Sequence, residues 1–299
     1  MKKSLSLVLM LLLALSLIFA GCAAEAPVEE PAEEPVEEVA APENPVIRLS
    51  TTTSVNDSGL LPYLQPYFEA ATGYTLEITS AGTGAAIEKA RTGDADCLLV
   101  HSKSQEEAFI GEGFNEERVS FMYNYFVVVG PEADPAGVSA TASAADAFAA
   151  IAASGSPFIS RGDASGTHTK ELGIWVTAGL LESADRDADG NYPLIEADWY
   201  QSVGQGMGAT LNIADEQQAY TLSDKATFLA HDDSLSILLE QADDMKNTYS
   251  MIAVSTDRFA DVNYDGALAF IEWMTSEEAA ELIAAYGVAE YGEALFYNL

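Results

Sequence analysis

From Val46 onward, short strand-like runs alternate regularly with longer helix-like runs. The strand-like runs cover residues 47–50, 75–79, 97–101, 121–130, 158–160, 199–203, 227–230 and 249–254. The helix-like runs cover residues 60–72, 85–92, 105–111, 140–153, 170–181, 208–222 and 267–286. Alternation of this kind builds a parallel sheet with helices on both faces. The sequence therefore predicts an α/β fold, with ligands bound at the carboxyl ends of the strands.

The alternating region is long enough for two lobes. It holds about 255 residues, and each half of that length can bury a core of its own. The run 121–130 is long enough to cross from one lobe into the other, and 249–254 is the second crossing. We expect residues 46–125 and 251–299 to form lobe I and residues 126–250 to form lobe II. Two crossings make a hinge, about which the lobes can close around a ligand.

Residues 1–21 have the features of a signal peptide. An apolar run over residues 5–20 follows two lysines, ends at small residues and is too short for a membrane helix. The residues before Cys22 resemble the bacterial lipobox, which implies cleavage before Cys22 and acylation of its sulfur. A secreted protein with a spare thiol is the alternative. We therefore expect an extracytoplasmic lipoprotein that is anchored to the cell membrane through Cys22.

Residues 22–45 form an acidic segment between this anchor and the alternating region. They include eight glutamates and five prolines, and no aromatic residue, lysine or arginine. Such a segment cannot bury enough apolar surface to fold, and its like charges keep it extended. We expect a disordered stalk.

The whole chain is strongly acidic, with 47 acidic residues against 13 basic ones and a formal net charge of −34. A surface of this kind argues against nucleic acid and anionic lipid as partners. A small anion is still an acceptable ligand, because surface charges are screened over roughly 8 Å while donors in a closed cleft act at contact distance. Cys97 is the only cysteine left after acylation, so no intramolecular disulfide is expected and a small core residue is predicted.

Two strand-to-helix turns are rich in hydroxyl groups. Residues 50–59 read Ser-Thr-Thr-Thr-Ser-Val-Asn-Asp-Ser-Gly, and residues 160–169 read Ser-Arg-Gly-Asp-Ala-Ser-Gly-Thr-His-Thr. The beginning of a helix has unpaired N–H groups and a partial positive charge, so an oxyanion can bind there. Hydroxyls add donors, and Arg161 supplies a charged fork that matches a tetrahedral oxyanion. We predict that the two turns face each other across a cleft.

Each turn also has other interpretations. Asp57 or Ser58 can act only as a helix cap, and Arg161 can form a surface ion pair with Asp163. Ser165 and His168 can be a nucleophile and its base, although no Gly-x-Ser-x-Gly elbow surrounds the serine. The other two histidines lie at the ends of strand-like runs and are expected to be structural.

Several motifs, in order from about residue 47 to the C-terminus, are similar to those of the tungstate-binding proteins of bacterial ABC uptake systems. They occupy residues 51–54 and 57–61, 93–101, 160–168, 206–211 and 219–224. The resemblance implies a two-lobed, type II periplasmic-binding-protein fold, in which each lobe is a mostly parallel sheet flanked by helices. It implies that tungstate is held in the hinge cleft and delivered to a membrane permease. The implied pocket residues are Thr52, Thr53, Ser54, Thr83, Arg161, Ser165, Gly166 and Thr167.

The chemistry of the ligand agrees with a pocket of donors. Tungstate and molybdate carry no proton at neutral pH, so their site should offer donors only. Phosphate keeps a proton and benefits from a carboxylate acceptor, which Asp57 or Asp163 can supply, so phosphate is the alternative ligand. The sequence does not separate tungstate from molybdate. We expect a monomer that has no enzymatic activity and requires no cofactor.

An acidic loop over residues 185–196 has the spacing of an EF-hand, with glycine at its sixth position. The candidate calcium ligands are Asp185, Asp187, Asp189, Asn191 and Glu196. A solvated acidic loop is the alternative. Residues 261–272 show the same spacing, but a helix-like run begins there, and we interpret Asp265 as its cap.

Overall fold

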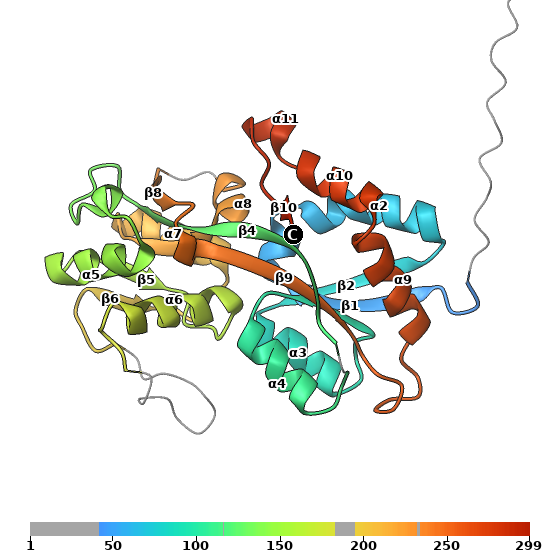
Figure 1. The fold of residues 1–299 in the computed structure, drawn as a ribbon. Coiled ribbons are helices and arrows are strands. Elements are labelled where there is room, and N and C mark those ends of the chain that lie inside the picture. The colour runs from blue at the N-terminus through green and yellow to red at the C-terminus, as the bar shows by residue number, and fades with distance from the viewer. Residues whose placement is uncertain (1–41, 116, 183–194, 232–233) are drawn as a thin grey trace, which may run out of the picture. The chain divides into compact units, whose positions relative to one another are not determined.

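The computed structural model describes residues 42–115, 117–182, 195–231 and 234–299, and Figure 1 shows how they are arranged. The strands are β1 (Val46–Thr52), β2 (Thr75–Ala81), β3 (Cys97–Val100), β4 (Val119–Gly130), β5 (Phe158–Ser160), β6 (Tyr200–Ser202), β7 (Thr221–Asp224), β8 (Ser236–Glu240), β9 (Lys246–Ala253) and β10 (Tyr297–Asn298). The helices are α1 (Thr53–Asp57), α2 (Leu60–Thr72), α3 (Thr83–Arg91), α4 (Lys103–Gly111), α5 (Ala144–Ser154), α6 (Gly166–Thr177), α7 (Met207–Gln217), α8 (Lys225–Leu229), α9 (Tyr264–Met274), α10 (Glu277–Ala285) and α11 (Val288–Tyr291). Across these ranges, every helix is too short or too polar to cross a membrane.

Strands β1, β2 and β3 are parallel, and β1 lies between the other two. Their carboxyl ends therefore meet at one edge of the sheet. The turns after β1, β2 and β3 lead directly into α1, α3 and α4. Apolar residues of these strands and of α2, α3, α9 and α10 form two buried clusters, one on each face, and we call this part lobe I.

Strands β4 and β9 run side by side through the molecule (Figure 1) and connect lobe I to a second part. Residues 119–125 of β4 pair with β9, whereas residues 126–130 pair with β7 and β8. The second part, lobe II, contains β5, β6, α5, α6 and α7 and has two buried apolar clusters of its own. The sheet is mixed rather than mostly parallel, because β4 and β9 run antiparallel to their neighbours.

Most of the predicted elements are present, and two differ in a way that affects the site. Helix α6 begins at Gly166, four residues before the predicted start, so Gly166 and Thr167 belong to its first turn. Residues 227–230 were expected to form a strand but lie mainly in α8, whose N-cap Asp224 accepts a hydrogen bond from the Thr227 N–H. A capping carboxylate of this kind satisfies an otherwise unpaired N–H group and favours the helix.

The alternative that Asp57 or Ser58 is only a helix cap is wrong, and so is the predicted cap at Asp265. The N-cap of α2 is Gly59, in a left-handed conformation with φ of 82°, so neither Asp57 nor Ser58 caps this helix. The N-cap of α9 is Asn263, whose side chain accepts from the Gly266 N–H, and Asp265 lies inside the first turn.

Several predictions fall on residues that the structure does not describe. The signal peptide, Cys22 and nearly all of the stalk lie outside the described residues, as do residues 183–194 of the acidic loop. Of the candidate calcium ligands only Glu196 is described. The described part of the chain contains no cluster of three or more His, Cys, Asp or Glu residues arranged to hold a metal ion.

Candidate functional site

The first group of hydroxyls lies where β1 ends and α1 begins. The last residues of β1 are buried, and Thr52 and Ser54 are each only 2% exposed, whereas Thr53 is half-buried. The Thr52 and Ser54 hydroxyl oxygens are 3.2 Å apart, and Ser54 Oγ lies 3.3 Å from His101 Nε2. The end of β1 therefore places hydroxyls in the interior rather than on the surface.

Arg161 directly follows strand β5, all of whose residues are buried, and its side chain lies in the interior of the protein. Its side chain is 3% exposed, and Nη2 donates to Asp163 Oδ2 at 2.6 Å. Asp163 Oδ1 accepts from the Ser165 N–H at 3.2 Å, and Nη1 of Arg161 lies 3.5 Å from Thr167 Oγ1. The ion pair with Asp163 is therefore present, but Arg161 is buried rather than at the surface, and the pair fixes the direction of the guanidinium.

Ser165 is the N-cap of α6. Its Oγ accepts from the His168 N–H at 3.2 Å, which leaves the hydroxyl proton free to be donated. The imidazole of His168 is turned elsewhere, because its Nδ1 accepts from the Ala164 N–H at 3.1 Å. The geometry of a nucleophile and its base is therefore not formed by Ser165 and His168.

The turns of the two lobes contact each other. A Cβ atom on Gly82, in the turn after β2, would lie 3.6 Å from the backbone of Asp163 and Ser165. A Cβ atom on Gly166 would lie 2.5–2.9 Å from three ring atoms of His101, which follows β3. The arginine-bearing turn of lobe II thus faces the turns after β2 and β3, and glycine is required where His101 packs.

Two buried donors at this contact have no hydrogen-bond partner in the described part of the chain. They are Thr83 Oγ1, in the first turn of α3, and Arg161 Nε. Leaving a buried polar group unpaired costs about 1–3 kcal/mol. We use the name donor cluster for Thr52, Ser54, Thr83, Arg161, Ser165 and Thr167, all of which are at most 2% exposed. The cluster therefore retains donors that an anion can accept.

His101 was expected to be structural, but it lies against the donor cluster. Its Nδ1 is 2.8 Å from Asn247 Oδ1, and the Asn247 amide in turn donates to Asn124 and Tyr249. Burial lowers the pKa of His101 to about 4, the hydrogen bond to Asn247 opposes this shift, and the positive charge of Arg161 adds to it. The ring is therefore neutral at physiological pH. The position of His101 directly after β3 was the signal that pointed to the site.

Asp224 is a second residue that the predicted pocket omitted. It is fully buried, and burial raises the pKa of its carboxyl group, while hydrogen bonds from Thr227 and the charge of Arg161 act in the opposite direction. Oδ1 caps α8, but Oδ2 has no hydrogen-bond partner within the described residues. The motif at 219–224 contained this residue, so the signal was present in the sequence.

Two lobes, two connecting strands and a site at the strand ends between them define the class, which is that of the periplasmic solute-binding proteins. The PBP superfamily domain matches residues 39–278 of the chain. The chain is 41% identical over 300 residues to the tungstate-binding protein TupA of Peptoclostridium acidaminophilum, covering 99% of this chain and 98% of that protein. It belongs to the PBP superfamily and, within it, to the family of TupA proteins.

Solved structures agree with this assignment. The tungstate ABC transporter structure from Geobacter sulfurreducens has a TM-score of 0.72 at 39% identity, covering 83% of this chain and 100% of that one. The tungstate-binding protein TupA from Desulfovibrio alaskensis G20 has a TM-score of 0.69 at 38% identity, covering 85% and 99%. The predicted α/β fold of the periplasmic-binding-protein type is confirmed.

Proposed function

We propose that this protein is the extracytoplasmic solute-binding component of an ABC uptake system and that its ligand is tungstate. The donor cluster carries the proposal, because it is buried between the lobes and its donors on Thr83 and Arg161 have no partner among the residues that the structure describes. A tetrahedral dianion without a proton accepts hydrogen bonds at all of its oxygens and needs only donors. The names of the TupA relatives support the same ligand.

Each predicted pocket residue has a role in this proposal. Arg161, held by Asp163, supplies the charged donor. Hydroxyl donors come from both lobes, and the backbone N–H groups at the beginning of α6 add the partial positive charge of a helix N-terminus. The proposed ligands are Thr52, Thr53, Ser54, Thr83, Arg161, Ser165, Gly166 and Thr167. Closure of the lobes around the anion produces the surface that the permease subunits recognise.

Calorimetric titration of the ligand-free protein with tungstate, molybdate, sulfate and phosphate tests this function. We expect tungstate and molybdate to bind with similar affinity, because both are tetrahedral dianions of nearly the same size, and sulfate and phosphate to bind more weakly. Phosphate binding more tightly than tungstate would overturn the proposal.

Phosphate is the second candidate ligand, and a substitution of Asp224 distinguishes it from tungstate. Asp57 is exposed, and both oxygens of Asp163 already accept from Arg161 and Ser165. Asp224 Oδ2 is unpaired within the described ranges, and as part of a carboxylate it can accept the proton of phosphate. An Asp224→Asn substitution removes that acceptor. We expect tungstate affinity to change less than tenfold, whereas a phosphate-binding site would lose its ligand.

We further propose that the mature chain begins at Cys22 and is held at the membrane by acylation of that residue. The support is the sequence before Cys22, which lies outside the described residues. The wild type should carry the mass of the lipid, and a Cys22→Ala variant should lack it. A wild-type chain without the lipid mass would contradict the proposal.

We also propose that the loop at 185–196 binds a structural calcium ion, on the basis of its ligand spacing. Calcium should raise the melting temperature of the wild type, and Asp187→Ala should abolish the increase. Asp257→Ala, which removes an exposed acid elsewhere, is the control. A calcium response that survives Asp187→Ala would exclude this loop.

A further inference from the structure

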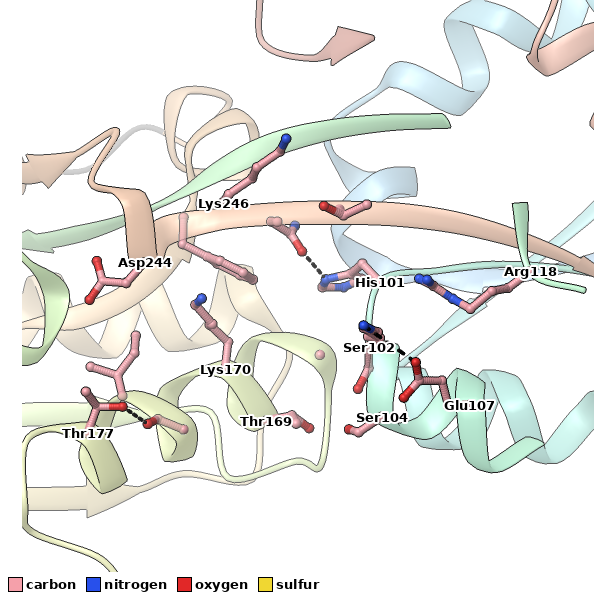
Figure 2. A pocket seen from close by; sticks show the side chains of 17 residues that line it. His101, Ser102, Ser104, Glu107, Arg118, Thr169, Lys170, Thr177, Asp244 and Lys246 are labelled. Atoms are coloured by element: carbon pink, nitrogen blue, oxygen red, sulfur yellow. Dashed lines mark hydrogen bonds and ion pairs between the residues drawn. The ribbon is translucent and has the colours of Figure 1, made fainter. Parts of the chain in front are cut away.

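A cavity of about 730 Å³ lies beside the donor cluster, between α6 of lobe II and the beginning of α4 of lobe I (Figure 2). One face of α6 forms its wall on one side, with residues three or four apart in the chain, as a helix requires. These residues are Gly166, Thr169, Lys170, Gly173, Ile174 and Thr177. Ser102, Lys103 and Ser104 approach from the opposite side, and the strand β9 contributes Asn247 and Thr248. We call this space the outer cavity.

The outer cavity has the opposite charge from the rest of the chain. Its lining contains four cationic side chains and two acidic ones, an excess of two positive charges in a chain whose formal net charge is −34. The four cations are Lys103, Arg118, Lys170 and Lys246, and the two acids are Glu107 and Asp244. Because only 13 residues of the chain are basic, this concentration singles the cavity out as a place for an anion.

Three of these cations already have partners. Lys103 pairs with Glu107 at 3.6 Å, Arg118 pairs with the buried carboxylate of Glu106 at 2.6 Å, and the Lys246 ammonium lies 3.8 Å from the centre of the Tyr123 ring. The Lys170 ammonium makes a longer contact of this last kind, 5.9 Å from the centre of the Phe126 ring. Lys170 is half-buried, and no ion pair joins it to another residue in the described ranges. In Figure 2 its side chain extends from α6 into the space below β9.

Ser102 provides an independent observation on the other wall. It is the N-cap residue of α4 and is 5% exposed, yet its hydroxyl makes no capping hydrogen bond. Its Oγ has no hydrogen-bond partner among the described residues, and the residue lines the cavity. No side chain in the described part of the molecule caps α4, and the acid in its first turn, Glu106, is paired with Arg118. A helix N-terminus beside a hydroxyl that has no partner among the described residues is the arrangement of an anion site.

We propose that the outer cavity is a second anion site, in which Lys170, Ser102 and the beginning of α4 hold a hydrated oxyanion before it reaches the donor cluster. This inference rests on the proposed function of the donor cluster. The cavity has room for an oxyanion together with on the order of ten water molecules. A lysine ammonium is a strongly hydrated point charge, which suits a ligand that keeps its water.

Two residues that line the outer cavity also adjoin the donor cluster, and they form the wall between the two sites. His101 and Gly166 line the outer cavity, and Ser54 of the donor cluster lies 3.3 Å from His101 Nε2. Because His101 belongs to lobe I and Gly166 to lobe II, separation of the lobes opens the contact between them. An anion held in the outer cavity then has a short path inward, along which it exchanges water for protein donors.

The direct test uses the Arg161→Ala form of the full chain, in which the inner site is weakened. Sulfate and tungstate are titrated in separate experiments, and the backbone resonances of Lys103, Ser104 and Lys170 are followed by NMR. We expect saturable shifts in the millimolar range that disappear when Lys170→Gln is added. They should persist with Lys89→Gln, which removes the same charge from α3. Absence of saturable shifts, or shifts that survive Lys170→Gln, would overturn the second site.

The kinetic test compares tungstate binding to the wild type, Lys170→Gln and Lys89→Gln by stopped flow. Loss of a steering charge lowers the association rate more than it changes the dissociation rate. We expect Lys170→Gln alone to slow association by roughly three- to tenfold at low salt, with the difference shrinking as salt is added. Equal association rates for the two lysine variants would refute the path. A wild type that bound no tungstate would instead refute the proposed function, and the sulfate titration would still decide the outer site.

Discussion

The donor cluster and the outer cavity meet at His101 and Gly166, and they are built from different groups. The cluster consists of hydroxyls and one arginine, all at most 2% exposed, and the arginine is held by Asp163. The cavity has room for water and is lined by Lys170 and the beginning of α4. Fixed donors in a closed site act at low dielectric and discriminate by geometry, whereas mobile charges in a wet cavity act at longer range and attract any anion. The difference assigns selectivity to the inner site and capture to the outer one.

The largest effect is expected from pH, through the histidine that separates the two regions. The pKa of His101 is lowered from the ordinary 6.5 to about 4, so between these values the unfolded chain binds a proton that the folded chain does not. The stability it contributes is complete above pH 6.5 and is lost as the pH falls toward 4, with a total on the order of 3 kcal/mol. Urea unfolding at neutral and acidic pH should show a smaller loss for His101→Gln than for the wild type. His231→Gln should lose as much stability at acidic pH as the wild type does. An equal loss in the two variants would show that His101 is not the source of the pH dependence.

The next largest effect concerns the charge inside the donor cluster. Arg161→Ala removes a charge-assisted donor and should weaken tungstate binding by about 1.5–3 kcal/mol, or roughly 10- to 150-fold. Calorimetry measures it. Arg91→Ala breaks exposed ion pairs with Glu88 and Glu112 and should leave the affinity unchanged. Unchanged affinity in Arg161→Ala would mean that the anion binds elsewhere.

A methyl group at the wall between the regions tests their contact. In Gly166→Ala the new Cβ would lie 2.5 Å from the nearest atom of the His101 ring, which Asn247 holds in place. The lobes must then separate, and we expect tungstate affinity to fall by about 1–3 kcal/mol. Gly173→Ala, on the same helix with no atom within 4 Å of its Cβ, is the matched control and should not weaken binding. Equal affinities for the two variants would show that the contact is not needed for closure.

The smallest effect separates binding from stability within the cluster. Thr83→Val keeps the shape of the side chain but removes a buried hydroxyl that has no partner in the described part of the chain. Tungstate affinity should therefore fall by about 1 kcal/mol, while the ligand-free protein loses no stability. Thr51→Val removes a hydroxyl that donates to the Leu99 carbonyl at 2.7 Å. It should lower the stability of the ligand-free protein and leave the tungstate affinity unchanged. Calorimetry and thermal melting measure both. The reverse pattern would place Thr83 among the structural residues.

The sequence predicted correctly those elements whose signal lies within one short segment of the chain. Helix α2 begins at Leu60 and ends at Thr72, as its apolar spacing and Gly73 indicated. The hydroxyl-rich turns were recognised for the same reason, because each is one short segment of chain. The prediction was wrong at residues 227–230, where a short run of apolar and β-branched residues suits a strand as well as a helix, and the cap from Asp224 decided in favour of α8.

Sequence alone determined that strands alternate with helices, that hydroxyls follow β1 and β5, and that one arginine accompanies them, since each of these features is encoded in neighbouring residues. Tertiary structure decided the rest. It placed His101 against Gly166, Arg161 within the interior and Lys170 opposite Ser102. These pairs come from different strand ends and different lobes, and no local pattern specifies which ends will meet once β4 and β9 have joined the two lobes.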